Sequence, residues 1–282
     1  MLEAAIRKEI EGFVRDSHEN RFLEDGGPFF AEPLVGFAAA DDPLFREYKN
    51  IIGAFHQTPQ DVMAKAFGND VRAQTVIVWV LPVVRTTSES NGREERFPSR
   101  EWAVTRALGE KFNSALRRHV TSYLEGLGHR TVAPQLASGW RQLDDETIGL
   151  ASTWSERHAA YAAGLGTFSL NDGFITPKGI SHRLGSVVTT LSLAPTRRIA
   201  PDHLHNCLYY REGTCGACIG RCPIGAISRS GHDKGKCRGY VYGTVPEAVG
   251  SCYGVKETGC GLCQTRVPCE GMVPPGKKQH GH

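Results

Sequence analysis

Apolar residues recur at helical spacing at the start of the chain. The apolar positions of residues 2–15 fall on one helical face, and they are Leu2, Ile6, Ile10, Phe13 and Val14. Residues 21–40 are interrupted by glycine and proline, so we expect a loop there. A helix is expected over residues 41–56. Another begins after Thr58, which is a favourable N-cap, with Pro59 in the first turn.

The middle of the chain has the pattern of a strand, a long helix and a second strand. Residues 74–84 form a nearly continuous run of apolar, mostly β-branched side chains, which is typical of a strand buried on both faces in a parallel sheet. The polar stretch 86–98 interrupts this pattern. Ser99 then begins an amphipathic helix that runs to Leu127, and residues 131–133 read as a short strand. This order predicts a βαβ unit.

A further helix and strand complete the predicted N-terminal domain. The helix covers residues 153–163 and ends at Gly164, and the strand covers residues 185–191. We therefore predict an α/β domain with a mixed or parallel sheet and helices on both faces. A chain of 282 residues is long enough for two domains.

Charge and hydropathy narrow the class of protein. The 33 basic and 30 acidic residues give a net charge of +3, which offers no electrostatic case for binding nucleic acid or a membrane surface. No apolar run approaches the roughly 20 residues of a membrane span. The N-terminus mixes charged and apolar residues and has no signal-peptide pattern. We expect a cytoplasmic protein.

The cysteines indicate metal chemistry. All nine lie after residue 206, and the reducing cytosol disfavours structural disulfides. Residues 207–223 and 252–269 both read C-x7-C-x2-C followed by a further cysteine. The first segment ends C-x2-C-x3-C-P, close to the motif of bacterial two-cluster ferredoxins, in which the fourth cysteine binds the other cluster. We therefore predict a cofactor and substrate domain over residues 1–200 and a ferredoxin-like domain with two 4Fe-4S clusters over residues 201–282.

Interleaved ligation divides the cysteines into two sets. The first cluster is expected to bind Cys207, Cys215, Cys218 and Cys269. The second is expected to bind Cys222, Cys260 and Cys263, together with either Cys237 or Cys252. The competing interpretation is a pair of zinc sites with four cysteine ligands each.

Three blocks of sequence resemble the epoxyqueuosine reductase family, which is related to the reductive dehalogenases. They are SERHAAYAAGLG at residues 155–166, the segment 171–190, and the cysteine segments within residues 215–269. A family cysteine aligns with Cys237, so the resemblance favours Cys237 over Cys252. It also implies an external electron donor such as flavodoxin or ferredoxin, and a base-off cobalamin in the N-terminal domain. The expected cofactor-binding residues are Gly164, Leu165, Gly166, His182, Gly185 and Ser186.

The sequence also departs from the family pattern. The position of the family's proton-donating aspartate falls near Leu150, so the catalytic residue is unknown and the candidates are Glu156, Tyr161 and Asp145. The chain stops soon after Cys269 without the helical-repeat tail that handles tRNA in many members. We therefore expect a divergent paralogue that acts on a small-molecule or nucleoside-like substrate. The alternative is a ferredoxin-like electron-transfer protein with no cobalamin and no substrate of its own.

Overall fold

The computed structural model describes residues 2–24, 26–145 and 149–276, and the chain divides into two compact units. The first unit comprises Met1–Val84, Ala107–Leu165 and His182–Ile199, and the second comprises Arg85–Arg106, Gly166–Ser181 and Ala200–His282. The chain leaves the first unit for the last time after Ile199, and the sequence analysis expects the domain boundary after residue 200. The chain also enters the second unit twice before that point, which its composition does not mark.

The first unit contains a four-stranded sheet, a hairpin and the helices around them. Its helices are α1 (Leu2–Asp16), α2 (Leu44–Ile51), α3 (Pro59–Phe67), most of α5 (Arg100–Gly126) and α6 (Glu156–Ala162). Its strands are β1 (Leu34–Ala39), β2 (Thr75–Pro82), β3 (Thr131–Val132), β4 (Gln142–Asp145), β5 (Gly149–Ser152) and β8 (His182–Thr189). The predicted start of α3 is confirmed, because the Thr58 hydroxyl accepts a hydrogen bond from the Asp61 amide at 3.2 Å and the Asp61 carboxylate accepts one from the Thr58 amide at 3.0 Å.

The prediction of a parallel or mixed sheet is wrong. The strand order is β1-β2-β8-β3, and each neighbouring pair is antiparallel. The sheet is therefore neither parallel nor mixed. β2 and β3 do run in the same direction, as a βαβ unit requires, but β8 arrives later in the chain and lies between them in the opposite direction. The continuous apolar pattern of β2 reports burial on both faces and not strand direction.

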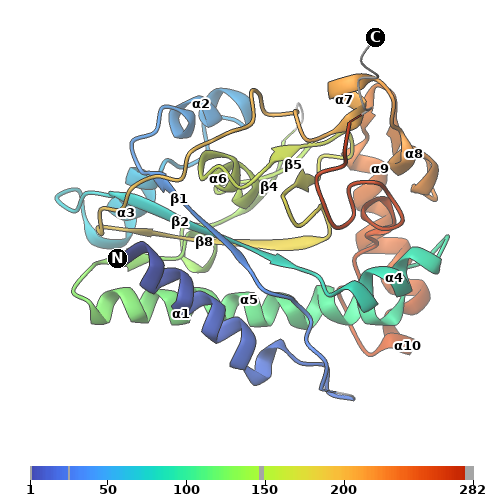
Figure 1. Ribbon diagram of the computed structural model, residues 1–282, viewed down its shortest axis with the longest axis horizontal. Coiled ribbons are helices and arrows are strands. Elements are labelled where there is room, and N and C mark those ends of the chain that lie inside the picture. Colours follow the sequence, from blue (N-terminus) through green and yellow to red (C-terminus); the bar gives the residue numbers. More distant parts are fainter. Residues whose placement is uncertain (1, 25, 146–148, 277–282) are drawn as a thin grey trace, which may run out of the picture. The chain divides into compact units, whose positions relative to one another are not determined.

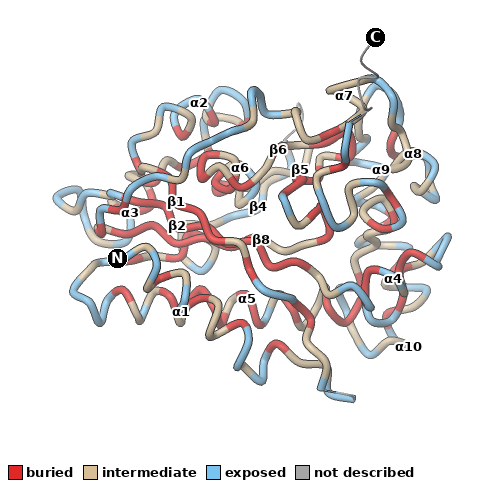
Figure 2. Tube along the Cα trace, viewed as in Figure 1, coloured by how far each residue is buried: buried red, intermediate tan, exposed pale blue. Residues whose placement is uncertain are grey.

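Helices cover both faces of this sheet, as predicted (Figure 1). α1 and α5 lie against one face, where the Trp79 indole of β2 donates a hydrogen bond to Asn113 of α5 at 2.9 Å. α6 packs against β1, β2 and β8 from the other face, and α2 packs against α6. All eight residues of β2 are buried as a result. Figure 2 shows that the buried residues of this unit concentrate along the central strands.

β1 and α4 are among the elements that the sequence analysis missed. β1 lies in the segment expected to be a loop, because Gly36 weakens the strand pattern. A Cβ at Gly36 would stand 2.7 Å from the Ala163 carbonyl, so glycine allows the end of α6 to approach β1. α4 (Arg85–Arg93) lies in the polar stretch and buries Thr87, Ser88 and Asn91. Among these, Asn91 donates hydrogen bonds to Cys260 and Thr265 of the same unit.

The second unit consists of short elements around the cysteines. Besides α4 and the start of α5, it contains β6 (Thr167–Phe168), β7 (Phe174–Ile175), α7 (Leu208–Glu212), α8 (Ala217–Arg221), β9 (Ile227–Ser228), β10 (Gly231–His232), α9 (Lys234–Gly239) and α10 (Ser251–Tyr253). Two π-helical segments, Tyr240–Thr244 and Pro246–Gly250, continue the helical path between α9 and α10. The small apolar core is Leu170, Ile175, Ile180, Cys207, Ile227 and Val267. A ferredoxin-like character of this unit stays a prediction.

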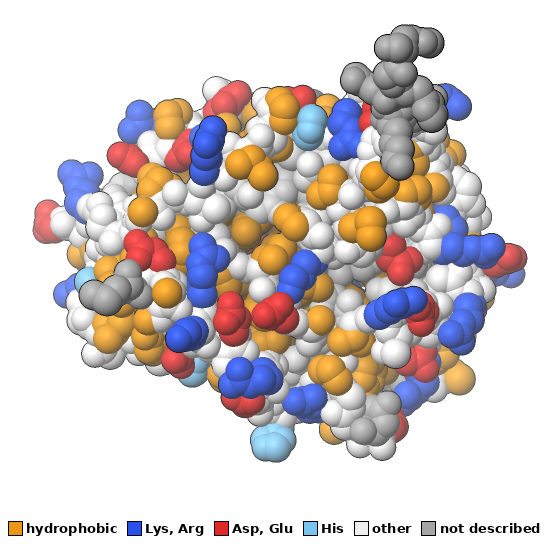
Figure 3. Space-filling model, in the orientation of Figure 1, with side chains coloured by type: hydrophobic (Ala, Val, Ile, Leu, Met, Phe, Trp, Pro, Cys, Tyr) orange, Lys and Arg blue, Asp and Glu red, His pale blue; other side chains and the backbone are white. Residues whose placement is uncertain are grey.

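The surface agrees with the near-neutral charge of the sequence. Basic and acidic side chains are interspersed on the face drawn in Figure 3 and are not gathered into a patch of one sign. Among the described residues, no helix combines the length and the apolar character that crossing a bilayer requires.

Candidate functional site: two sets of cysteines

The four cysteines of the first predicted set line a single pocket. Cys207, Cys215, Cys218 and Cys269 surround a space of about 370 Å³, open solvent included. Leu170, Ile175 and Val267 form part of the same wall. The four sulfurs come from segments up to 62 positions apart (269 − 207), so their convergence is a product of the fold and not of the C-x2-C turn alone.

Backbone hydrogen bonds hold these segments around the pocket. The Cys207 amide bonds to the Leu204 carbonyl at 3.0 Å, and Cys207 caps α7. The Ile219 amide bonds to the Gly216 carbonyl at 2.9 Å, which closes the turn between Cys215 and Cys218. The Cys269 carbonyl accepts a bond from the Ile180 amide at 2.9 Å, so the segment after β7 positions the remote cysteine.

The thiols of this set influence one another electrostatically. The pKa of Cys218 is raised to about 11, chiefly by burial and in addition by the neighbouring Cys207 and Cys215. Burial also raises the pKa of Cys269 to about 12, with Cys207 and Cys218 again adding to the effect. Four thiolates at these positions would repel one another without a cationic centre between them, whereas metal coordination stabilises the deprotonated form.

A second set of thiols shows the same mutual influence. Burial raises the pKa of Cys260 to about 11, and the Cys237 and Cys222 thiols add to this shift. Burial also raises the pKa of Cys263, with further contributions from Cys260 and Cys237. The Cys222 sulfur accepts a hydrogen bond from the Ala226 amide at 3.2 Å.

Cys252 lies in a different environment from these four thiols. It is exposed on α10. It contributes to raising the pKa of the neighbouring Tyr253. Burial is the larger cause of that shift. The choice of Cys237 over Cys252 as a ligand stays a prediction, and the electrostatic influence of Cys237 on Cys260 and Cys263 supports it.

The donor chemistry fits an iron–sulfur cluster. Four cysteine sulfurs around one pocket match the ligation of a 4Fe-4S cluster, which takes one thiolate at each of its irons. Within the described part of the chain, no group of three or more His, Cys, Asp or Glu side chains is arranged to hold a single metal ion.

Two polar residues that the sequence analysis did not single out hold the cysteine segments together. Asn91 of α4 is fully buried and donates to the Thr265 hydroxyl at 3.1 Å and to the Cys260 carbonyl at 3.3 Å. Arg221 of α8 donates to four backbone carbonyls, those of Leu262, Thr265, Glu94 and Asn91. The sequence could have indicated α4 only as a helix within a polar stretch. It could not indicate the hydrogen bonds, because the bonded residues lie some 130 to 174 positions apart.

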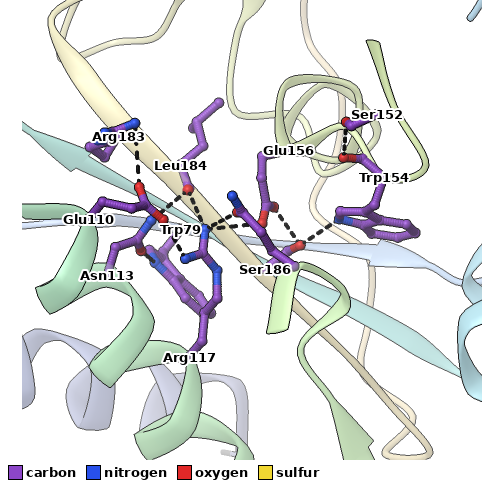
Figure 4. A network of polar contacts seen from close by, with 11 residues as sticks. Trp79, Glu110, Asn113, Arg117, Ser152, Trp154, Glu156, Arg183, Leu184 and Ser186 are labelled. Carbon is purple, nitrogen blue, oxygen red and sulfur yellow. Dashed lines mark hydrogen bonds and ion pairs between the residues drawn. The ribbon is translucent and has the colours of Figure 1, made fainter. Parts of the chain in front are cut away.

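The first unit contains a separate network of buried charges (Figure 4). Arg117 of α5, with 1% of its side chain exposed, contacts Glu110 at 2.8 Å and Glu156 at 3.3 Å. Glu156 also accepts a hydrogen bond from the Ser186 hydroxyl at 2.6 Å. Burial raises the pKa of Glu156, and Arg117 opposes that shift. The Leu184 carbonyl accepts bonds from Asn113 at 2.9 Å and Arg117 at 3.2 Å.

The three catalytic candidates have different surroundings. Glu156 opens α6 and belongs to the buried network. Tyr161 lies on the same helix, where it contributes to raising the pKa of Tyr48, after burial and Asp42. Asp145 ends β4, and its side chain lies outside the described residues. A catalytic role for any of the three stays a prediction.

The expected cobalamin residues lie in closely packed positions. A Cβ at Gly164 would stand 2.9 Å from the Arg197 carbonyl, and one at Gly185 would meet the Trp79 indole. Gly166 faces the Ile175 backbone in the same way. Of the other three, Leu165 is 7% exposed, Ser186 is fully buried, and His182 begins β8 opposite Pro82. Packing accounts for the three glycines, and contact with cobalamin stays a prediction.

Comparison with known proteins confirms the expected resemblance in sequence. No family model matches the chain. A curated epoxyqueuosine reductase from Bacillus anthracis is 32% identical over 119 residues, which covers 40% of this chain and 29% of that protein. The match thus spans less than a third of the curated relative.

Solved structures extend the resemblance to the fold. An epoxyqueuosine reductase from Streptococcus thermophilus gives a TM-score of 0.54 at 16% identity, over 97% of this chain and 68% of that chain. A selenomethionine-labelled epoxyqueuosine reductase gives 0.53 at 17% identity, over 97% and 69%. A catabolic reductive dehalogenase gives 0.51 at 14% identity, over 97% and 38%. The fold of this chain is therefore shared with epoxyqueuosine reductases and with a reductive dehalogenase. The chain resembles the epoxyqueuosine reductases among them in both sequence and fold.

Proposed function

We propose that the chain is an iron–sulfur oxidoreductase of the epoxyqueuosine reductase type, in which two 4Fe-4S clusters pass electrons to an acceptor site in the first unit. The observation that carries this proposal is the convergence of Cys207, Cys215, Cys218 and Cys269 on one pocket. The mutual influence of Cys222, Cys237, Cys260 and Cys263 supports a second cluster. Each cluster supplies one-electron transfer when bound.

The residues of the chain supply burial, position and hydrogen bonds to these clusters. The apolar wall of the pocket limits the contact of the first set of sulfurs with water, and solvent exposure is one of the factors that set the reduction potential of a cluster. The Ala226 amide stabilises negative charge on the Cys222 sulfur. Asn91 and Arg221 fix the loop that carries Cys260 and Cys263 by bonding to its carbonyls.

Cobalamin is the acceptor that the family resemblance implies. The chain's own atoms occupy the space beside Gly164, Gly166 and Gly185, so these positions do not by themselves indicate a corrin surface. We assign no chemical step to cobalamin, and its binding is the part of the proposal that needs a direct test.

The substrate belongs to the proposal as well. One structure with the same fold, with a TM-score of 0.50 at 17% identity over 95% of this chain and 65% of that chain, is an epoxyqueuosine reductase with a tRNA stem loop carrying epoxyqueuosine. The mixed surface charges of the present chain favour a small-molecule or nucleoside-like substrate over a large nucleic-acid footprint. Salt-dependent binding of a tRNA stem loop would contradict this preference.

Titration with cobalamin separates the enzyme from the electron carrier. We expect anaerobically reconstituted protein to bind cobalamin at micromolar concentration with a base-off absorption spectrum. Protein that carries both clusters and leaves the cobalamin spectrum unchanged would instead be a ferredoxin-like electron-transfer protein.

A further inference from the structure

Tyr209 belongs both to the pocket of the first cysteine set and to the surface of the second unit. It lies in α7, two positions after Cys207, and it lines the pocket. The residue is half-buried and packs against the small apolar core of the unit. Its hydroxyl donates a hydrogen bond at 2.7 Å to the carbonyl of Arg229, an exposed residue in the turn between β9 and β10. The ring therefore extends from the pocket wall to an exposed part of the unit.

Hydrogen bonds from two of its side chains hold α7 beside the pocket. The Tyr209 hydroxyl connects the helix to the β9–β10 turn through Arg229. Arg211 donates to the Pro274 carbonyl at 3.0 Å, and Pro274 lines the same pocket. The helix also begins at the pocket, because the Arg211 amide bonds to the Cys207 carbonyl at 2.9 Å. The position of the Tyr209 ring is therefore fixed by the helix and by its own hydroxyl.

A tyrosine has the chemistry that the edge of such a pocket requires. Its ring is apolar, whereas its hydroxyl forms a hydrogen bond where the residue meets water. Negative charge is more stable in water than among apolar groups. A cluster with four thiolates becomes more negative when it is reduced, so an apolar cover disfavours the reduced form and lowers the reduction potential.

We propose that Tyr209 is a positioning residue that closes the first pocket towards the solvent and thereby lowers the reduction potential of the first cluster. This inference rests on the proposed function. Reduction by an external one-electron donor adds one negative charge to the cluster and its thiolates, with no bond formed or broken. The ring provides the cover, and the bond to the Arg229 carbonyl keeps the ring in place.

The test is a redox titration of the full chain, purified without oxygen and followed by electron paramagnetic resonance. In Tyr209→Ala, the ratio of reduced to oxidised first cluster at a fixed potential should rise by about threefold or more, because water reaches the pocket. The second cluster should keep its midpoint. Tyr209→Phe keeps the ring without the hydroxyl and should recover most of the wild-type ratio.

Solvent access to the first cluster can be measured on the same samples. In D₂O, the electron spin-echo modulation from exchangeable deuterium near the reduced first cluster should be stronger in Tyr209→Ala than in the wild type. Tyr242→Ala is the matched control, because it removes an exposed ring of the same unit that does not line the pocket. It should change neither the midpoint of the first cluster nor its deuterium modulation.

The outcomes are distinguishable. Iron-loaded protein whose first-cluster midpoint and deuterium modulation are the same in the wild type and Tyr209→Ala would overturn this inference and leave the proposed function standing. A midpoint shift of equal size in both clusters would overturn it as well. Wild-type protein that binds no iron would overturn both the inference and the proposed function. If Tyr209→Ala takes up no iron, Tyr209→Leu, which keeps an apolar side chain but lacks the ring, decides the question by the same readouts.

Discussion

His56 illustrates how burial gives a single side chain a measurable effect on the molecule. It is 1% exposed in the first unit, and its Nε2 accepts a hydrogen bond from the Ser155 amide at 3.2 Å. Burial lowers its pKa to about 4, and the charge of Lys49 acts in the same direction. The folded protein therefore holds this ring neutral at pH values where the unfolded chain protonates it.

The first prediction concerns the acid stability of the molecule. The contribution of His56 is fully present above pH 6.5, the ordinary pKa of the ring, and is lost as the pH falls towards 4. A shift of this size corresponds to about 3 kcal/mol at most. His56→Gln should flatten the fall in unfolding free energy between pH 7 and pH 4.5, as measured by urea denaturation. His18→Gln, at an exposed position, should keep the wild-type slope. Equal slopes in wild type and His56→Gln would contradict this account.

The second prediction concerns the eighth cluster ligand. Cys237 influences the pKa values of Cys260 and Cys263, whereas Cys252 is exposed on α10. Cys237→Ser should therefore lose about half of the bound iron, and Cys252→Ser should retain all of it. Iron content and the absorption of the reconstituted proteins measure the difference. The reverse result would assign the ligand to Cys252.

At the level of elements, α4 and α8 are tied to the loop of the second cysteine set. Arg221 of α8 donates to two carbonyls of this loop and to two at the end of α4, at distances of 2.8 to 3.3 Å. Hydrogen bonds from a charged donor each contribute roughly 1.5–3 kcal/mol, and a buried carbonyl left without a donor adds a cost.

The third prediction follows from this connection. Arg221→Met keeps much of the side-chain length but removes all four bonds, so we expect a loss of about 3 kcal/mol in the unfolding free energy of the cluster-loaded protein. The exposed Arg229 provides the matched control, and Arg229→Met should change stability by less than about 0.5 kcal/mol. Chemical denaturation monitored by cluster absorbance compares the two. Equal stabilities would show that Arg221 does not hold the loop.

Local patterns predicted the elements whose stability is local. Thr58 and Pro59 predicted the start of α3, and the apolar spacing after Ser99 predicted α5 to within a residue at each end. β1 and α4 were missed because distant partners determine them. Gly36 is required by the approach of α6, and Asn91 of α4 is bonded to Cys260 and Thr265, which lie far along the chain.

At the scale of the whole molecule, the order and direction of the strands were harder to predict from the sequence than the grouping of the cysteines. The direction of the sheet depends on β8, which inserts between β2 and β3 from about a hundred positions later than β2, and no periodicity encodes that insertion. The spacing of the cysteines grouped Cys207, Cys215, Cys218 and Cys269, and these four residues line one pocket. Their role as cluster ligands stays a prediction. The spacing could not show that residues 85–106 and 166–181 build the same unit, because these segments contain no cysteine.

The central claim is that the cysteines of this chain hold two iron–sulfur clusters. The most direct measurement is the iron, zinc and acid-labile sulfide content of protein purified without oxygen, together with its Mössbauer spectrum. We predict about eight iron and eight sulfide per chain, in the 4Fe-4S form. Stoichiometric zinc with neither iron nor sulfide would contradict the account.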